Sequence, residues 1–206
     1  MMHGILYSYL IFSFSFLQCH GQNDTGCGDK LRSEPKEEKI IRLRANKVTA
    51  DNERFENQDK ILVYAKLSES DSVIKIEHEL FPENVETTFN IVKDSVGRIC
   101  IISEYPFSIS GDWFSGFDHY FDTCGYLYAV QKTVCYFNGD CADDEVCEFT
   151  ETYYDAYFII VDSQYQLASA SAEIITDENC KPPYTFEYMV FPNVPELIRY
   201  HGLQEM

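Results

Sequence analysis

Basic side chains, histidine and tryptophan are scarce in this 206-residue chain. There are one Trp, five His and 16 Lys plus Arg against 34 Asp plus Glu, so the formal net charge is −18. Residues 99–206 hold 18 acidic and 3 basic side chains, whereas residues 1–98 hold 16 and 13. An acidic surface repels phosphate backbones and anionic lipids, so we exclude nucleic acid and membrane surfaces as partners. The charge either attracts calcium or basic proteins or serves solely to keep the protein soluble.

Catalytic motifs are missing as well. The chain has no GxSxG elbow, HExxH pair, phosphate-binding loop or dinucleotide fingerprint. Asp118, His119 and Asp122 lie close together in the sequence, and a His beside a carboxylate could act as a base. A surface His flanked by acids is the more ordinary interpretation. We therefore predict that the protein is not an enzyme and requires no cofactor.

The N-terminus carries the one long uncharged run. Residues 1–21 contain no Asp, Glu, Lys or Arg, and their apolar core is shorter than the ~20 residues of a membrane span. Small residues at Cys19 and Gly21 suit a signal-peptide cleavage site. We expect a secreted, extracellular protein with no membrane span. Residues 22–39 are expected to form a polar arm, which includes the one glycosylation sequon, at Asn23.

Apolar and polar side chains alternate from residue 40 onward, which is the period of a half-buried strand. This alternation, or enrichment in aromatic and β-branched residues, predicts strands at 41–45, 61–67, 73–77, 85–92, 98–103, 126–137, 149–161 and 165–176. No convincing amphipathic helix of ten or more residues precedes a short helix expected near 195–202. We predict one mainly β domain over residues 40–206. It should be an antiparallel β-sandwich or half-barrel of two stacked sheets, disulfide-stabilised and with little helix.

Seven cysteines remain after removal of the signal peptide with Cys19, and an oxidising compartment favours disulfides. Because seven is odd, one is either free or links two chains as a disulfide-bonded homodimer. Sequence alone leaves the connectivity open, although we favour bonds within residues 124–147 and a bond between Cys100 and Cys180. Zinc is disfavoured because no CxxC pair occurs. The seven are Cys27, Cys100, Cys124, Cys135, Cys141, Cys147 and Cys180.

An acidic run lies between the last cysteines of the 124–147 segment. Asp140, Asp143, Asp144 and Glu145 could supply the oxygen ligands that calcium prefers. The run lacks the acid spacing and the central Gly of a helix-loop-helix calcium site. We favour a solvated, charged hairpin turn over a calcium site for this run. Calcium is therefore one of two interpretations of these residues.

Four segments together resemble the ependymin-related secreted glycoproteins. They are Cys27 near the mature N-terminus, the Cys100-containing stretch FNIVKDSVGRICIISEYPFSI, the run YYDAYFIIVD, and Cys180 ahead of a proline-rich tail. The likeness covers roughly residues 25–182, and the 124–147 segment holds more cysteines than that pattern needs. The resemblance implies two antiparallel sheets stacked around an apolar pocket, dimerisation and calcium-associated behaviour. It also implies roles in extracellular matrix, adhesion or lipid binding.

Two functions fit these observations. The first is a non-enzymatic binding protein that holds a lipid-like molecule in its interior or binds calcium or a matrix protein through its acidic face. The small residues Ala168, Ala170 and Ala172 would leave room for such a ligand or for bulky neighbours. The second is a structural or interaction protein that acts through its acidic surface and has no ligand pocket. A pocket of a few hundred cubic ångströms would favour the first.

Overall fold

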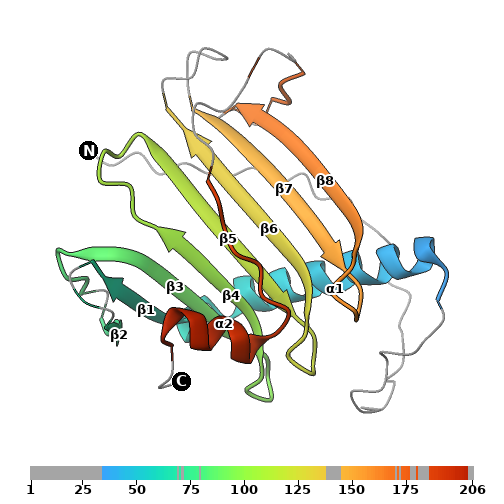
Figure 1. The fold of residues 1–206 in the computed structure, drawn as a ribbon, viewed down its shortest axis with the longest axis horizontal. Coiled ribbons are helices and arrows are strands. Elements are labelled where there is room, and N and C mark those ends of the chain that lie inside the picture. The colour runs from blue at the N-terminus through green and yellow to red at the C-terminus, as the bar shows by residue number, and fades with distance from the viewer. Residues whose placement is uncertain are drawn as a thin grey trace.

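The computed structural model describes residues 34–68, 70, 72–78, 80–137, 145–169, 171, 173–176, 180 and 186–203. Its strands form an eight-stranded antiparallel sheet in the order β2-β1-β3-β4-β5-β6-β7-β8 (Figure 1). The strands are β1 Leu62–Leu67, β2 Val73–Lys75, β3 Val85–Lys93, β4 Ile99–Pro106, β5 Trp113–Phe121, β6 Leu127–Tyr136, β7 Val146–Tyr154 and β8 Ile160–Ser169. The prediction of a mainly β, antiparallel fold is confirmed. The described strands lie in one sheet, with helices rather than a second sheet on its faces.

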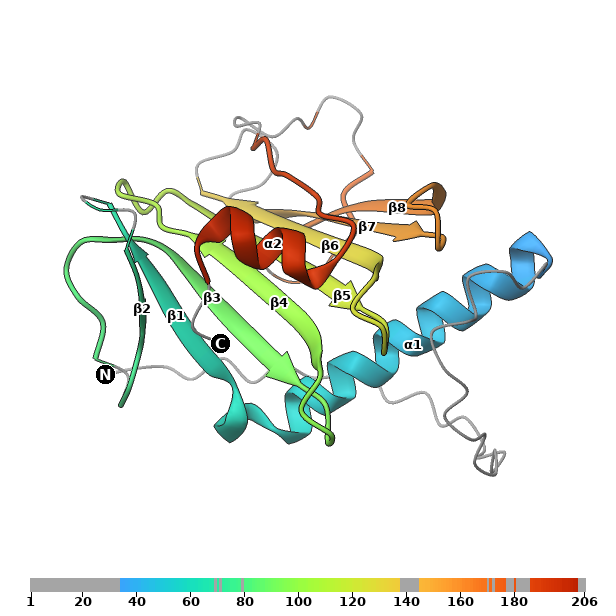
Figure 2. The same ribbon diagram turned by 60° about the horizontal axis from the view of Figure 1, so that its bottom comes forward.

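Helix α1, Lys36–Glu56, crosses one face of this sheet (Figure 2). The helix contains no Gly or Pro, Pro35 precedes its first turn, and Glu37 and Glu38 lie at the positive end of its dipole. Burial of an apolar cluster holds it in place. The cluster consists of Leu43, Ala50, Val92, Ile101, Tyr120, Tyr128, Ala129 and Tyr153.

The prediction of a strand at 41–45 is therefore wrong, as is the expectation that no long helix precedes the tail. Ile41 is 69% exposed on the outer side of α1. The sheet-facing side carries Lys47, Asp51 and Arg54 among its apolar residues, and these charges obscure the helical period.

Ion pairs between α1 and the sheet explain why charged residues face inward. Lys47 Nζ lies 3.0 Å from a carboxylate oxygen of Asp51 and 3.2 Å from one of Glu151 on β7. The Arg54 guanidinium lies 2.9 Å from Asp51 and 3.1 Å from Asp118 on β5. Each basic group thus has two carboxylate partners, which a group removed from water requires.

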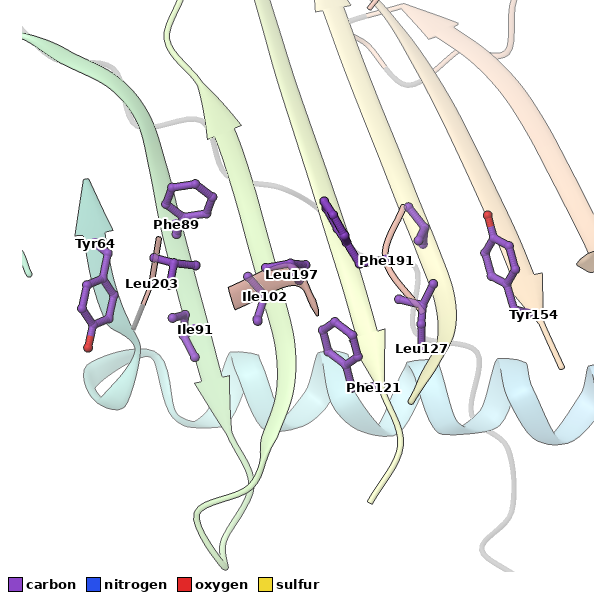
Figure 3. Close-up of a cluster of buried hydrophobic side chains, with 11 residues drawn as sticks. Tyr64, Phe89, Ile91, Ile102, Phe121, Leu127, Tyr154, Phe191, Leu197 and Leu203 are labelled. Carbon is purple, nitrogen blue, oxygen red and sulfur yellow. The ribbon is translucent and has the colours of Figure 1, made fainter. Parts of the chain in front are cut away.

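The opposite face of the sheet is covered by the C-terminal segment and helix α2, Val194–His201 (Figure 2). The Asn193 side chain caps this helix by accepting from the Glu196 N–H at 3.0 Å, and Gly202 ends it in a left-handed conformation. The short helix expected near 195–202 is confirmed. Figure 3 shows the cluster on this face, which consists of Tyr64, Phe89, Ile91, Ile102, Phe121, Leu127, Val130, Tyr154, Phe191, Leu197 and Leu203.

Several expected boundaries differ from those in the structure. The strand expected at 149–161 is the end of β7, a turn and the start of β8. The strand expected at 165–176 ends at Ser169, and the chain turns back so that Ile174 bridges Ala168. Residues 36–39, expected in the polar arm, form the first turn of α1. No helix in the described ranges is long and apolar enough to cross a membrane.

Candidate functional site

A pocket of about 470 Å³ lies between α1 and three hairpin turns at one edge of the sheet. The turns join β3 to β4, β5 to β6 and β7 to β8. The apolar part of the wall includes Leu43, Ala50, Phe121, Leu127, Tyr128 and Tyr154. The charged residues of the lining are Lys39, Arg42, Glu53, Asp94, Asp122 and Asp155.

The three turns share one hydrogen-bond pattern, in which Asp94, Asp122 and Asp155 occupy equivalent positions. In each turn the aspartate Oδ1 accepts from the backbone N–H groups two and four residues later, at 2.8–3.1 Å. The aspartate N–H in turn donates to the carbonyl four residues later, at 2.8–2.9 Å. Two bonds to a single oxygen fix the direction of each carboxylate. The rim of the pocket is therefore built from carboxylates held by backbone.

The fourth position of each turn requires a left-handed conformation. Gly97 and Gly125 occupy it with φ of 86° and 77°, whereas the third turn has Phe158 with φ of 62°. A non-glycine residue there has a conformational cost. The Phe158 ring stacks on Tyr154, with 5.0 Å between centroids, which offsets part of that cost.

The basic residues of the pocket have carboxylate partners. Arg42 donates to both carboxylate oxygens of Glu34, at distances down to 2.8 Å. Lys39 Nζ lies 3.9 Å from Asp155 Oδ2.

The four acids of the pocket differ in whether they have a basic partner. Lys39 lies near Asp155, and Asp94 Oδ2 accepts from Arg98 Nε at 2.7 Å. Neither Glu53 nor Asp122 has a Lys, Arg or His within ion-pair distance among the described residues. With four acids against two bases in the lining, the pocket carries an excess of negative charge.

Cys100 and Tyr128 add polar atoms to the pocket wall. The Cys100 thiol donates to the Val92 carbonyl at 3.4 Å. Burial, reinforced by the charges of Asp94 and Glu53, raises its pKa to about 11. The thiol is therefore protonated at neutral pH and a poor nucleophile.

Tyr128 is 7% exposed, and its hydroxyl has no hydrogen-bond partner among the described residues. Burial, and then the nearby charge of Asp51, raises the pKa of this hydroxyl. The pocket wall thus presents a neutral hydroxyl that can both donate and accept.

The disulfides confirm one of the expected pairings and contradict another. Cys135 and Cys147 are bonded across β6 and β7, as expected for bonds within residues 124–147. The Cys100–Cys180 bond is wrong, because Cys100 is a free thiol in the α1 cluster. Cys180 is disulfide-bonded and packs in a different cluster, and Cys124 is disulfide-bonded as well. The expected cysteines Cys27 and Cys141 lie outside the described residues.

Of the four expected calcium ligands the structure describes Glu145 alone, and this residue is not part of the pocket lining. Asp140, Asp143 and Asp144 are outside the described residues, as is the sequon at Asn23. Glu145 Oε1 lies 3.7 Å from Cys147 Sγ, beside the disulfide. Both sulfur atoms are already bonded to each other, so they cannot act as thiolate ligands. Calcium binding at the acidic run stays a prediction.

The Asp118–His119 pair considered as a catalytic base is separated by the sheet. Asp118 faces α1 and pairs with Arg54, while His119 faces the C-terminal segment. Adjacent residues of a strand point to opposite faces, so the two side chains cannot act together. The expectation of a surface His is wrong, since His119 is fully buried and its Nε2 lies 3.4 Å from the Met189 carbonyl. Burial lowers its pKa.

A second buried polar pair lies under α2. His201 Nε2 is 3.4 Å from Glu104 Oε2. Burial raises the pKa of Glu104 to about 7, against the opposing effect of Lys66, and lowers the pKa of His201 to about 4. Between these values both groups are uncharged, and His201 Nε2 is buried without a hydrogen-bond partner among the described residues.

Sequence reasoning overlooked the pocket, although a signal for it was present. The stretches DSVGR, DTCGY and DAYFI each begin with the aspartate of an equivalent turn. Recognising their shared spacing would have identified three similar hairpins. No family model, curated protein or solved structure gives a significant match to this chain.

Proposed function

We propose that this protein is a secreted, non-enzymatic binding protein that holds a small amphipathic molecule in the pocket beneath α1. The observation that carries the proposal is the pocket itself, about 470 Å³ in volume with an apolar wall and a charged rim. Ligand sites in proteins are commonly 300–1,000 Å³ and combine a mostly apolar lining with a few placed polar groups. Secretion rests on the N-terminal sequence.

The proposed site differs from the interior site expected for a lipid carrier. Phe89, Ile91 and Ile102 are fully buried in the cluster under α2, so that face of the sheet is filled by side chains. Ala168, expected to leave space for a ligand, is bridged by Ile174. The pocket at the edge of α1 is the better candidate.

Fluorescence of N-phenyl-1-naphthylamine, an uncharged apolar probe, would test the proposal. We expect saturable binding by wild-type protein. Asn46 lines the pocket from an exposed position on α1, so Asn46→Trp should fill the pocket mouth and weaken binding at least tenfold. Val48 is 59% exposed on the same helix and is not part of the lining, so Val48→Trp is the matched control.

Absence of saturable binding, or equal loss in both variants, would refute the pocket as a ligand site. That result would favour the alternative of a matrix or interaction protein that acts through its acidic surface. The ependymin-related resemblance and calcium binding are further proposals that this experiment does not require.

A further inference from the structure

We infer that the pocket beneath α1 selects ligands with a cationic group, namely organic amines joined to an apolar body. This inference rests on the proposed function and specifies its ligand class. It is carried by the arrangement of charge in the pocket, by the apolar wall and by the Tyr128 hydroxyl, for which the described part of the chain provides no hydrogen-bond partner.

The charge imbalance is not compensated within the described part of the protein. Arg42 is held by Glu34 and Lys39 lies near Asp155, so neither basic group is directed at the two remaining acids. Glu53 and Asp122 both line the pocket, one on α1 and the other on the β5–β6 turn. A ligand ammonium group would pair with carboxylates that otherwise lack a cation.

Asp122 is preorganised for this role. Its Oδ1 accepts from the N–H groups of Cys124 and Tyr126, both at 2.9 Å, which fixes the plane of the carboxylate. Its Oδ2 has no hydrogen-bond partner among the described residues. A fixed acceptor loses little side-chain entropy on binding, so more of the interaction energy appears as affinity.

Aromatic and apolar groups account for the rest of the ligand. Tyr128 and Tyr154 belong to the wall, and aromatic faces attract cations as well as apolar surface. Tyr128 is 7% exposed, and its hydroxyl, which has no hydrogen-bond partner among the described residues, would accept from an ammonium or donate to a ligand oxygen. A bare metal ion would leave the apolar wall unused, whereas an amphipathic amine would contact both halves of the pocket.

Displacement of N-phenyl-1-naphthylamine by decylamine, decanol and decanoate would test charge selectivity at constant chain length. We expect decylamine to bind at least about tenfold more tightly than decanol, because hydrogen bonds to charged groups are the stronger kind. Decanoate should bind most weakly. Higher ionic strength should weaken decylamine binding and leave decanol unchanged.

Variants that remove charge at constant shape would assign the effect. Glu53→Gln and Asp122→Asn should each bring decylamine toward the affinity of decanol, and asparagine retains the oxygen acceptor that the turn needs. Glu56→Gln, an exposed change three residues further along α1 and outside the lining, should have no effect. Unfolding midpoints would verify that each variant is folded.

The outcomes separate this inference from the proposed function. Probe binding without preference for decylamine, or a preference that survives both substitutions, would overturn the cation selectivity alone. Failure of the probe to bind at all would overturn the proposed function.

Discussion

Lys47 on α1 and Glu151 on β7 form an ion pair in which 3.2 Å separates Nζ from Oε1 and the lysine side chain is 8% exposed. The same ammonium group lies 4.8 Å from the ring centre of Tyr120. A charge removed from water to this extent is stabilised by its partners, and they in turn depend on it. The pair therefore links the N-terminal helix to the sheet, and removal of either side chain leaves the other charge without this partner.

Replacing Lys47 with Met should destabilise the protein by about 3 kcal/mol, because Asp51 and Glu151 lose their common cation. The double variant Lys47→Met, Glu151→Gln should recover part of this loss, since it removes one of the stranded charges. Urea unfolding at pH 7 would measure both. Lys60→Met is the control, because Lys60 is exposed and contacts Asn57 at the surface. Additive effects of the two changes would show that the pair is not coupled.

The Glu104–His201 pair should give stability an unusual dependence on pH. The pKa of Glu104 is raised from 4.5 to about 7, so the folded state holds its proton more tightly, and this contribution to stability falls as pH rises through that range. The pKa of His201 is lowered from 6.5 to about 4, so its contribution rises with pH from 4 to 6.5. The two effects oppose each other up to about pH 6.5, above which Glu104 alone remains.

We therefore expect Glu104→Gln to be more stable than the wild type at pH 8 by about 2 kcal/mol, with a smaller difference at pH 5. Thermal unfolding across pH 5 to 8.5 would measure this. Glu83, an exposed acid just before β3, offers a matched Glu→Gln control. An equal difference in stability between Glu104→Gln and the wild type at pH 5 and at pH 8 would show that Glu104 is ionised at both pH values.

The turn glycines provide a test of backbone conformation without packing. Gly97 has a φ of 86° and nothing within 4 Å of an added Cβ, so Gly97→Ala should cost about 1–2 kcal/mol through conformation alone. Phe158→Gly should change stability by less than about 1 kcal/mol. Glycine adopts the positive φ at this position without the conformational cost of phenylalanine, and this gain offsets the lost stacking on Tyr154. Urea unfolding would measure both, and a neutral Gly97→Ala would contradict the shared turn geometry.

Cys100 should report on the pocket through its reactivity. With a pKa of about 11, the thiol should react with iodoacetamide about a hundredfold more slowly at pH 7.5 than a thiol of pKa 9. The rate should increase with pH and decrease when decylamine occupies the pocket. Mass spectrometry of modified peptides would follow Cys100, with Cys100→Ser as the blank. Rapid modification at pH 7.5 would contradict a buried thiol.

Strand positions were predictable because alternation is a local property. Turn residues in the sequence indicate the hairpin around Asp94 and Gly97, and capping residues indicate the helix between Asn193 and Gly202. Helix α1 was not predictable in the same way. Its inward charges are satisfied by groups far away in the sequence, such as Tyr120, whose hydroxyl donates to Asp51 across 69 positions at 2.8 Å.

The candidate site was less accessible to sequence analysis than the fold. Its residues are dispersed over α1 and three turns, and the order of strands is what brings Asp94, Asp122 and Asp155 to one edge. The acids and cysteines at 124–147 led to predictions of disulfides and a calcium site because they are neighbours in the sequence. Asp118 and His119 show the limit of such proximity, since the sheet separates them.

The position of α1 ahead of the described strands in the sequence has a consequence for folding. From β3 to β8, strands that are consecutive in the sequence are neighbours in the sheet, so their contacts can form hairpin by hairpin. The helix instead pairs with several strands: Arg54 with Asp118 on β5, Lys47 with Glu151 on β7, and Arg44 with Asp162 on β8 across 118 positions. During synthesis α1 emerges before all of the described strands, yet its set of partners is incomplete until β8 has been made. The helix that closes the pocket is thus made before the sheet and is among the last elements to dock.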